Sequence, residues 1–104
     1  MIDMKMKAIR YYEYGGPDQL VLEETDIPVP KTGEVLVKVH FAAVNPWDWK
    51  FRSGLYKDRI SAQFPVIPGA EASGVVAALG SGVSGFQVGQ EVYGNVSGGY
   101  AEYA

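Results

Sequence analysis

VNPWDWKFRSGLYKDRISAQFPVIPGAEASG, residues 44–74, is the stretch around which this chain of 104 residues is organised. It holds both tryptophans, three of the six prolines and a group of polar side chains: Asn45, Asp48, Lys50 and Arg52. Two strand-like runs flank it. Because loops held by a rigid scaffold usually carry binding and catalytic groups, we expect one wall of a functional site here.

Residues 34–44, just before this stretch, show the strongest strand pattern in the sequence. Strict alternation places one set of side chains on a single face: Val35, Val37, Val39, Phe41 and Ala43. The expected strand ends where Pro46 removes a backbone donor. Residues 48–54 are compatible with one helical turn, because Pro46 stands near its start.

Other short strands are expected on both sides of this region. Residues 4–12 and 20–24 predict a hairpin around the Gly-Gly-Pro-Asp turn, and three later strands are expected at 71–79, 91–94 and 100–103. Segments 27–30 and 64–69 are expected to be extended, because each carries two prolines. Six or seven short strands, thirteen glycines and no full-length amphipathic helix predict a mainly β barrel or sandwich.

The composition is that of one soluble globular domain, and it excludes several classes of site. A net charge of −3 without a basic face argues against nucleic-acid binding. The chain has no cysteine, and His40 is its single histidine, which excludes disulfides, thiolate chemistry and multi-histidine metal sites. No run approaches the roughly 18 apolar residues of a membrane span. We expect no membrane partner and a cytoplasmic location.

Seven motifs in order resemble the N-terminal catalytic domain of the medium-chain dehydrogenase/reductase superfamily. They are EVLVKV (34–39), NPWDWK (45–50), PVIPGAE (65–71), GVV (74–76), LGSGV (79–83), FQVGQEV (86–92) and GYAEY (99–103). The resemblance covers essentially the whole chain, and its strength lies in the order and spacing of the motifs. It implies a GroES-like, partly open β-barrel with short helical turns over residues 1–104.

Members of this superfamily carry a Rossmann domain after the barrel, and no sign of one is present in this sequence. A Gly-x-Gly-x-x-Gly motif between a strand and a helix would cradle a pyrophosphate. Gly80-Ser81-Gly82 is followed by no helix, so we interpret it as a turn. We therefore expect a chain truncated before its nucleotide-binding domain, which would supply the other wall of the site.

The resemblance also predicts that zinc is absent. Zinc-dependent relatives carry a cysteine where Asn45 stands and a histidine where Ala70 precedes Glu71. A catalytic zinc site takes three protein ligands, and two of those positions are unsuitable here. The implied branch is the zinc-free quinone oxidoreductases and enone reductases, in which NADPH delivers hydride to a quinone or to an activated double bond.

Within that branch the resemblance assigns roles to five residues. Asn45 is expected to hydrogen-bond a substrate carbonyl or the nicotinamide ribose, and Lys50 to place positive charge where an oxyanion develops. Asp48, Tyr56 and Tyr93 are expected to face the substrate or the cofactor.

Plainer roles remain open for the same residues. Asn45 is a favoured helix cap, Asp48 fits backbone amides or a pair with Arg52 at helical spacing, and Lys50 and Tyr56 fit an ordinary surface. The tryptophans are interpreted as anchors of the core or of a domain interface. Glu71 is expected to make a structural salt bridge or hydrogen bond.

Two alternatives to a quinone or enone reductase also remain open. One is a stand-alone GroES-like binding or scaffold module without catalysis, and the other is a zinc alcohol dehydrogenase domain with unusual ligands. A fragment without its second domain would expose apolar surface and an edge strand. We therefore expect either a homo-oligomer or self-association of the isolated chain, which would itself be inactive.

Overall fold

The structure of residues 5–104 is a computed structural model; Met4, which the sequence assigns to the first strand, lies outside the described residues. Five strands and one α-helix make up the regular structure of these residues, together with a short 3-10 helix, η1 (Pro17–Gln19). The strands are β1 (Lys5–Arg10), β2 (Val21–Asp26), β3 (Val35–Ala42), β4 (Glu71–Leu79) and β5 (Glu91–Asn95), and the α-helix is α1 (Pro46–Ser53).

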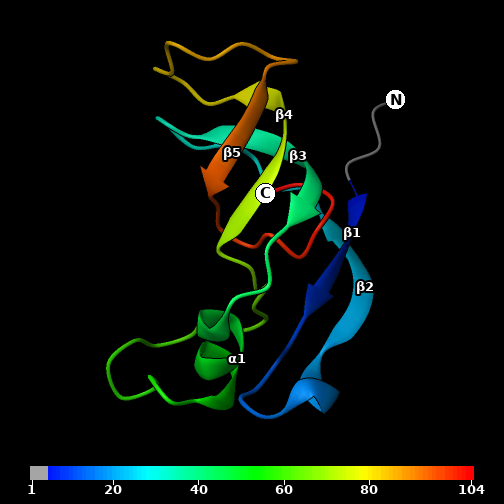
Figure 1. Ribbon diagram of the computed structural model, residues 1–104, viewed down its shortest axis with the longest axis vertical. Helices are drawn as coiled ribbons and strands as arrows, with labels where there is room; N and C mark the ends of the chain where they lie inside the picture. Colours follow the sequence, from blue (N-terminus) through cyan, green and yellow to red (C-terminus); the bar gives the residue numbers. More distant parts are fainter. Residues whose placement is uncertain (1–4) are drawn as a thin grey trace.

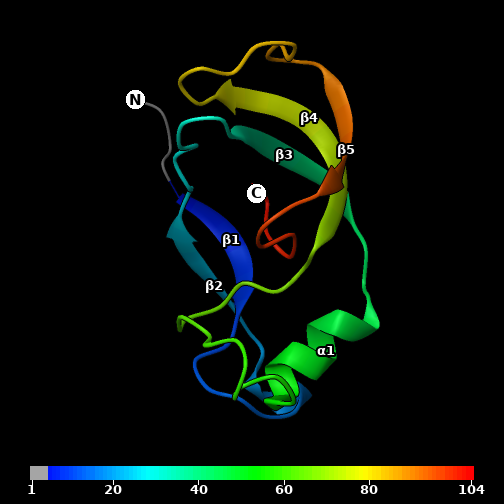
Figure 2. The same ribbon diagram turned by 90° about the vertical axis from the view of Figure 1, so that its left-hand side faces the viewer.

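The strands form two separate antiparallel sheets. β1 and β2 make a two-stranded sheet, and β3, β4 and β5 make a three-stranded sheet in that order. The sheets face each other across the molecule, and α1 lies at one end below the opening between them (Figures 1 and 2). The sheets are not closed into a full barrel, which confirms the mainly β, partly open fold.

Residues 100–104 connect the two sheets. On one side, the Ile9 and Glu102 amides donate to the Tyr100 and Lys7 carbonyls at 2.9 and 3.1 Å. On the other side, Val37 and Ala104 exchange a pair of backbone bonds at 2.8 and 2.9 Å. The strand predicted at 100–103 is therefore reduced to isolated bridges, to Ala8 and Lys38, because this short segment divides its hydrogen bonds between two partners.

The predicted alternation along β3 is wrong in detail. Two register irregularities, between Leu36 and Val37 and between Val39 and Phe41, change which side chains point inward. Leu36 and Val37 are both buried, whereas Phe41 is 77% exposed. A bulge places two residues of one strand opposite one of the other and so shifts the alternation that follows.

The core lies between the sheets and is small. Its buried apolar side chains are Met6, Ala8, Tyr11, Leu36, Val37, Ala72 and Val76. Gly74 of β4 is required by close packing, because a Cβ there would lie 2.0 Å from the Lys38 carbonyl oxygen of β3. The paired strands therefore leave no room for a side chain at this position.

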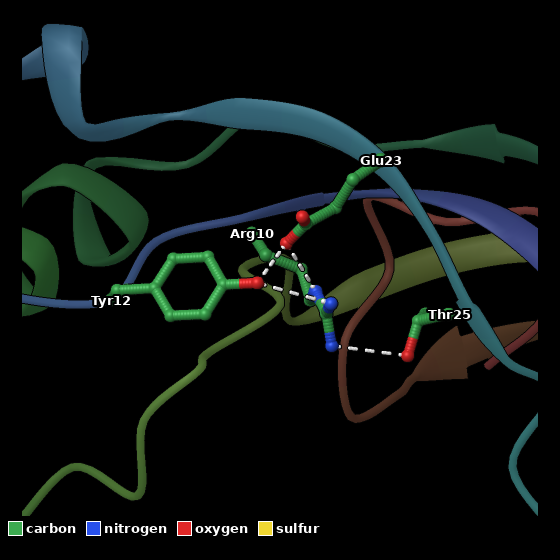
Figure 3. Close-up of polar contacts among 4 residues, drawn as sticks. All are labelled: Arg10, Tyr12, Glu23 and Thr25. Atoms are coloured by element: carbon green, nitrogen blue, oxygen red, sulfur yellow. Dashed lines mark hydrogen bonds and ion pairs between the residues drawn. The ribbon is translucent and has the colours of Figure 1, made fainter.

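A network of polar side chains ties β1 to β2 on the face that also carries the buried Met6 and Ala8, beyond the core residues (Figure 3). The Arg10 guanidinium donates to Glu23 at 2.7 Å, to Thr25 at 3.0 Å and to the Tyr12 hydroxyl at 3.1 Å, and that hydroxyl donates to Glu23. These bonds hold the pKa of Glu23 below its ordinary value, with the Tyr12 bond as the larger cause. Among residues 5–104, no helix has the length and apolar character of a membrane span.

Candidate functional site

The start of α1 is built by Asn45, Pro46 and Asp48. Asn45 has the extended backbone of an N-cap, and Pro46 occupies the first helical turn, where a missing N–H costs nothing. Asp48 completes the cap, because its Oδ2 accepts the Asn45 backbone N–H at 2.9 Å. Gly54 ends the helix in the left-handed conformation at φ 91°. The single turn predicted at 48–54 is thus an eight-residue helix that begins at Pro46.

The side chain of Asn45 is held by β4. Its Nδ2 donates to Glu71 Oε1 at 2.7 Å. The capping box directs the Asn45 side-chain oxygen towards the Asp48 backbone N–H, so the second N–H of the amide and the remaining lone pair of the oxygen are what a ligand could bond. Glu71 therefore has the structural hydrogen bond expected of it.

Asp48 is buried, with 5% of its surface exposed. Its Oδ2 also accepts the Tyr100 O–H at 2.6 Å, whereas its Oδ1 has no partner among the described residues. Burial raises the pKa of Tyr100 to about 12, and the bond to Asp48 adds to that rise. Of the two plainer roles, bonding to a backbone amide is the one observed, since the Arg52 Nε donates instead to the Gly15 carbonyl at 3.3 Å.

A hollow of about 190 Å³ opens beside these groups. Its walls come from four parts of the chain: Tyr11; Trp47, Asp48 and Phe51 of α1; loop 66–70; and loop 96–98. The two loops are joined by backbone bonds, including Gly99 to the Gly69 carbonyl at 3.0 Å and Val96 to the Ala70 carbonyl at 2.9 Å. The hollow is therefore framed by ordered backbone, and its lining is largely aromatic and aliphatic, as in sites for flat organic molecules.

Trp47 forms the outer wall of this hollow. It is 44% exposed and stacks on Tyr56 with ring centroids 5.0 Å apart and an angle of 22° between the planes. Phe51, one helical turn later, packs against the same indole at 5.6 Å. The three rings form one aromatic surface along α1 and the loop after it.

The side chains of the candidate site differ in how well they suit a metal ion and a nucleotide cofactor. Among residues 5–104, no group of three or more histidine, aspartate or glutamate side chains is placed to hold a metal ion. The Asn45 amide, which keeps an unused N–H and a second lone pair on its oxygen, and the aromatic surface fit the nicotinamide end of a dinucleotide. Gly80 and Ser81 lie in a tight turn that leads to β5 and not to a helix, so they provide no pyrophosphate cradle.

Comparison with known proteins identifies the family. Residues 31–104 match the family model of the alcohol dehydrogenase GroES-like domain. The chain belongs to this family. Rat (Rattus norvegicus) quinone oxidoreductase is 42% identical over 102 residues, which cover 95% of this chain and 30% of that protein. The resemblance to the medium-chain dehydrogenase/reductase superfamily is thereby confirmed.

Solved structures agree with this assignment of a GroES-like domain. The human synaptic vesicle membrane protein VAT-1 homolog-like protein superposes with a TM-score of 0.89 at 32% identity, over 98% of this chain and 32% of that one. The mycobacterial protein Rv1454c, solved in complex with NADPH, superposes with a TM-score of 0.86 at 37% identity, over 94% and 30%. The chain spans about 30% of the length of the curated relatives it matches.

Of the five predicted site residues, Asp48 lines the hollow, whereas Asn45 and Tyr56 contact residues that line it without lining it themselves. Asn45 and Asp48 lie at the start of α1, and Tyr56 stacks on the wall of the hollow. Lys50 does not line the hollow; its Nζ lies 5.8 Å from the Trp49 ring centroid. Tyr93 lies outside the hollow as well, on β5, where it is 90% exposed.

Two residues of the site were not given a site role by the sequence. Trp47 was interpreted as an anchor, although its spacing of four from Phe51 indicates a shared helix face. Tyr100 was interpreted only as part of a strand, and no local pattern signals its bond to Asp48, because 52 residues separate the two.

Proposed function

We propose that this domain is the substrate-binding part of a zinc-independent, NADPH-dependent oxidoreductase that reduces quinones or α,β-unsaturated carbonyls. The chain is similar to quinone oxidoreductases and to a protein solved with NADPH. The observation that carries the proposal is the aromatic hollow lined by Trp47, Asp48 and Phe51 of α1, the helix whose N-cap, Asn45, is bonded to Glu71. A cytoplasmic location is part of the same proposal.

In this proposal NADPH supplies the hydride, and the domain binds and orients the two reactants. The Trp47 ring and the apolar loop around Pro68 enclose a flat quinone or enone and exclude water from it. When NADPH is bound, the Asn45 amide would hydrogen-bond a hydroxyl of the nicotinamide ribose. Asp48 stays buried and holds the Asn45 backbone in place by accepting its N–H.

Zinc independence in this proposal rests on the residues that stand at the expected ligand positions. Asn45 and Ala70 occupy the places where zinc-dependent relatives carry cysteine and histidine. Asn45 is already bonded to Glu71, and Ala70 lines the hollow without a donor side chain. The roles of Lys50 as an oxyanion partner and of Tyr93 as a substrate contact stay predictions of the sequence.

A domain exchange tests the function. The matching 102 residues of rat quinone oxidoreductase are replaced by this chain, and NADPH oxidation is measured with a quinone and with an enone. We expect turnover, and we expect Trp47→Ala to raise KM while Trp49→Ala, the matched control on the side away from the hollow, leaves it unchanged. A folded chimera that binds NADPH and reduces neither substrate would refute the proposal.

A further inference from the structure

The outer face of the three-stranded sheet carries a patch that lies outside the hollow of the candidate site. Directly opposite residues of neighbouring strands share a face. The register therefore places two rows on one face, Phe41–Ser73–Tyr93 and Lys38–Val75–Glu91. We call these six residues the outer patch.

This outer patch is on the side opposite the core. The alternate residues of β4, Ala72, Gly74 and Val76, are buried. In contrast, Phe41 is 77% and Tyr93 is 90% exposed, and Lys38 and Glu91 are exposed as well. Shallow hollows of about 320 and 500 Å³ lie beside the Phe41–Ser73–Tyr93 row. Two large exposed aromatic rings on one sheet face are typical of an interaction surface.

The two charged side chains of the outer patch lie at its opposite edges, and neither has an ion-pair partner within residues 5–104. Lys38 is on β3 and Glu91 is on β5, both opposite Val75, so the middle strand separates them. Within residues 5–104, neither side chain takes part in a salt bridge or a side-chain hydrogen bond. The patch thus has a positive edge and a negative edge in the same row, with apolar residues between them.

We propose that the outer patch binds a second copy of this chain, face to face, about a two-fold axis parallel to the strands. Such an axis places β3 of each copy over β5 of the other and keeps the rows aligned. Lys38 then faces Glu91 of the other copy twice, and Phe41 faces Tyr93 twice. Packed sheets lie about 10 Å apart, a spacing that these side chains fill. A two-fold interface must be self-complementary, and the order of charge and aromatic groups in this patch meets that requirement.

Charge reversal tests this arrangement. Sedimentation equilibrium of the chain is measured over the micromolar to millimolar range, with circular dichroism to confirm folding. We expect Lys38→Glu alone and Glu91→Lys alone to weaken the dimer by roughly tenfold or more, because each change creates two like-charge contacts. An equimolar mixture of the two variants should dimerise again, because both contacts of the mixed pair then join opposite charges.

The controls separate the patch from general charge effects. Lys57→Glu and Glu13→Lys make the same changes in net charge at exposed positions outside the patch and should leave the dimer intact. Phe41→Ser should abolish it. A wild-type chain that stays monomeric to millimolar concentration, or a mixture that stays monomeric, would overturn the proposal. Neither result bears on quinone reduction, since the hollow contains none of the six residues.

Discussion

Asp48 joins the start of α1 to the C-terminal segment through a single carboxylate oxygen. That oxygen accepts from the Asn45 amide and from the Tyr100 hydroxyl, while the other oxygen is buried without a partner. A buried polar atom left unpaired costs about 1–3 kcal/mol. The two bonds that remain therefore matter for stability, and they also hold Asn45 against Glu71.

Tyr100→Phe is expected to lower the free energy of unfolding by about 1–2 kcal/mol, because a hydrogen bond to a carboxylate is lost. The pKa of Tyr100 is raised to about 12 in the folded chain against 10.0 for an ordinary tyrosine. The stability that the protonated Tyr100 hydroxyl contributes is therefore complete below pH 10, and it is lost as the pH rises towards 12. Urea unfolding between pH 8 and about 12 measures both effects. If wild type and variant showed the same slope above pH 10, this assignment would be wrong.

Asn45→Ala is expected to destabilise the domain by about 1 kcal/mol, since alanine is a poor N-cap and cannot bond Glu71. Glu71→Ala removes the same bond from the other side. We expect the double variant to lose less than the sum of the single losses, by about 0.5 kcal/mol or more, because the residues are coupled. Strict additivity in the urea midpoints would mean that the bond contributes nothing.

At the level of elements, loop 66–70 and the segment after β5 position the hollow, and Gly69 allows them to approach. Its φ is 107°, and a Cβ there would lie 2.7 Å from the Tyr100 ring and 2.8 Å from the Gly99 nitrogen. Two constraints therefore coincide at Gly69, a left-handed backbone and a close contact. Gly89, in the turn before β5, has a similar φ of 92° with open space around it.

Gly69→Ala is expected to cost about 3 kcal/mol or more, because backbone strain and overpacking add. Gly89→Ala introduces the backbone strain without the close contact, so it should lower the free energy of unfolding by about 1–2 kcal/mol. The difference between the two variants in thermal unfolding measures the cost of the close contact of a Gly69 side chain with Tyr100 and Gly99. Equal losses at the two sites would show that Tyr100 and Gly99 adjust without cost.

At the scale of the whole molecule, two open sheets are joined by a five-residue segment and enclose a small core. The hollow of the candidate site is lined by α1 and loops 66–70 and 96–98, and α1 lies at one end of this framework (Figure 2). Residues 5–104 contain no strand–glycine turn–helix unit of the kind that binds a pyrophosphate.

The isolated chain is therefore expected to show no saturable NADPH binding by calorimetry. The phosphates and adenosine contribute much of the affinity in a dinucleotide site, and their partners are not among these residues. Full-length rat quinone oxidoreductase serves as the positive control. A tight, stoichiometric complex with the isolated chain would contradict this prediction.

The elements of this domain were largely predictable, because they follow from local chemistry. Alternating apolar residues, the Asn45–Pro46 cap and the glycine turns act over a few residues, and β1 to β5 and α1 follow from them. The family was also accessible, since its motifs are read along the chain. The bulges of β3 were not, because they depend on the pairing with β4 and not on β3 alone.

The sequence by itself determined the mainly β fold and the family, and it predicted a candidate site at the start of α1. Tertiary structure alone decided which side chains meet there. It joined Asp48 to Tyr100 and Asn45 to Glu71, made Trp47 a wall of the hollow, and placed Lys50 and Tyr93 away from it. The physical reason is that sequence patterns report the periodicity of one segment, whereas a site consists of contacts between segments that only the packing of the whole chain specifies.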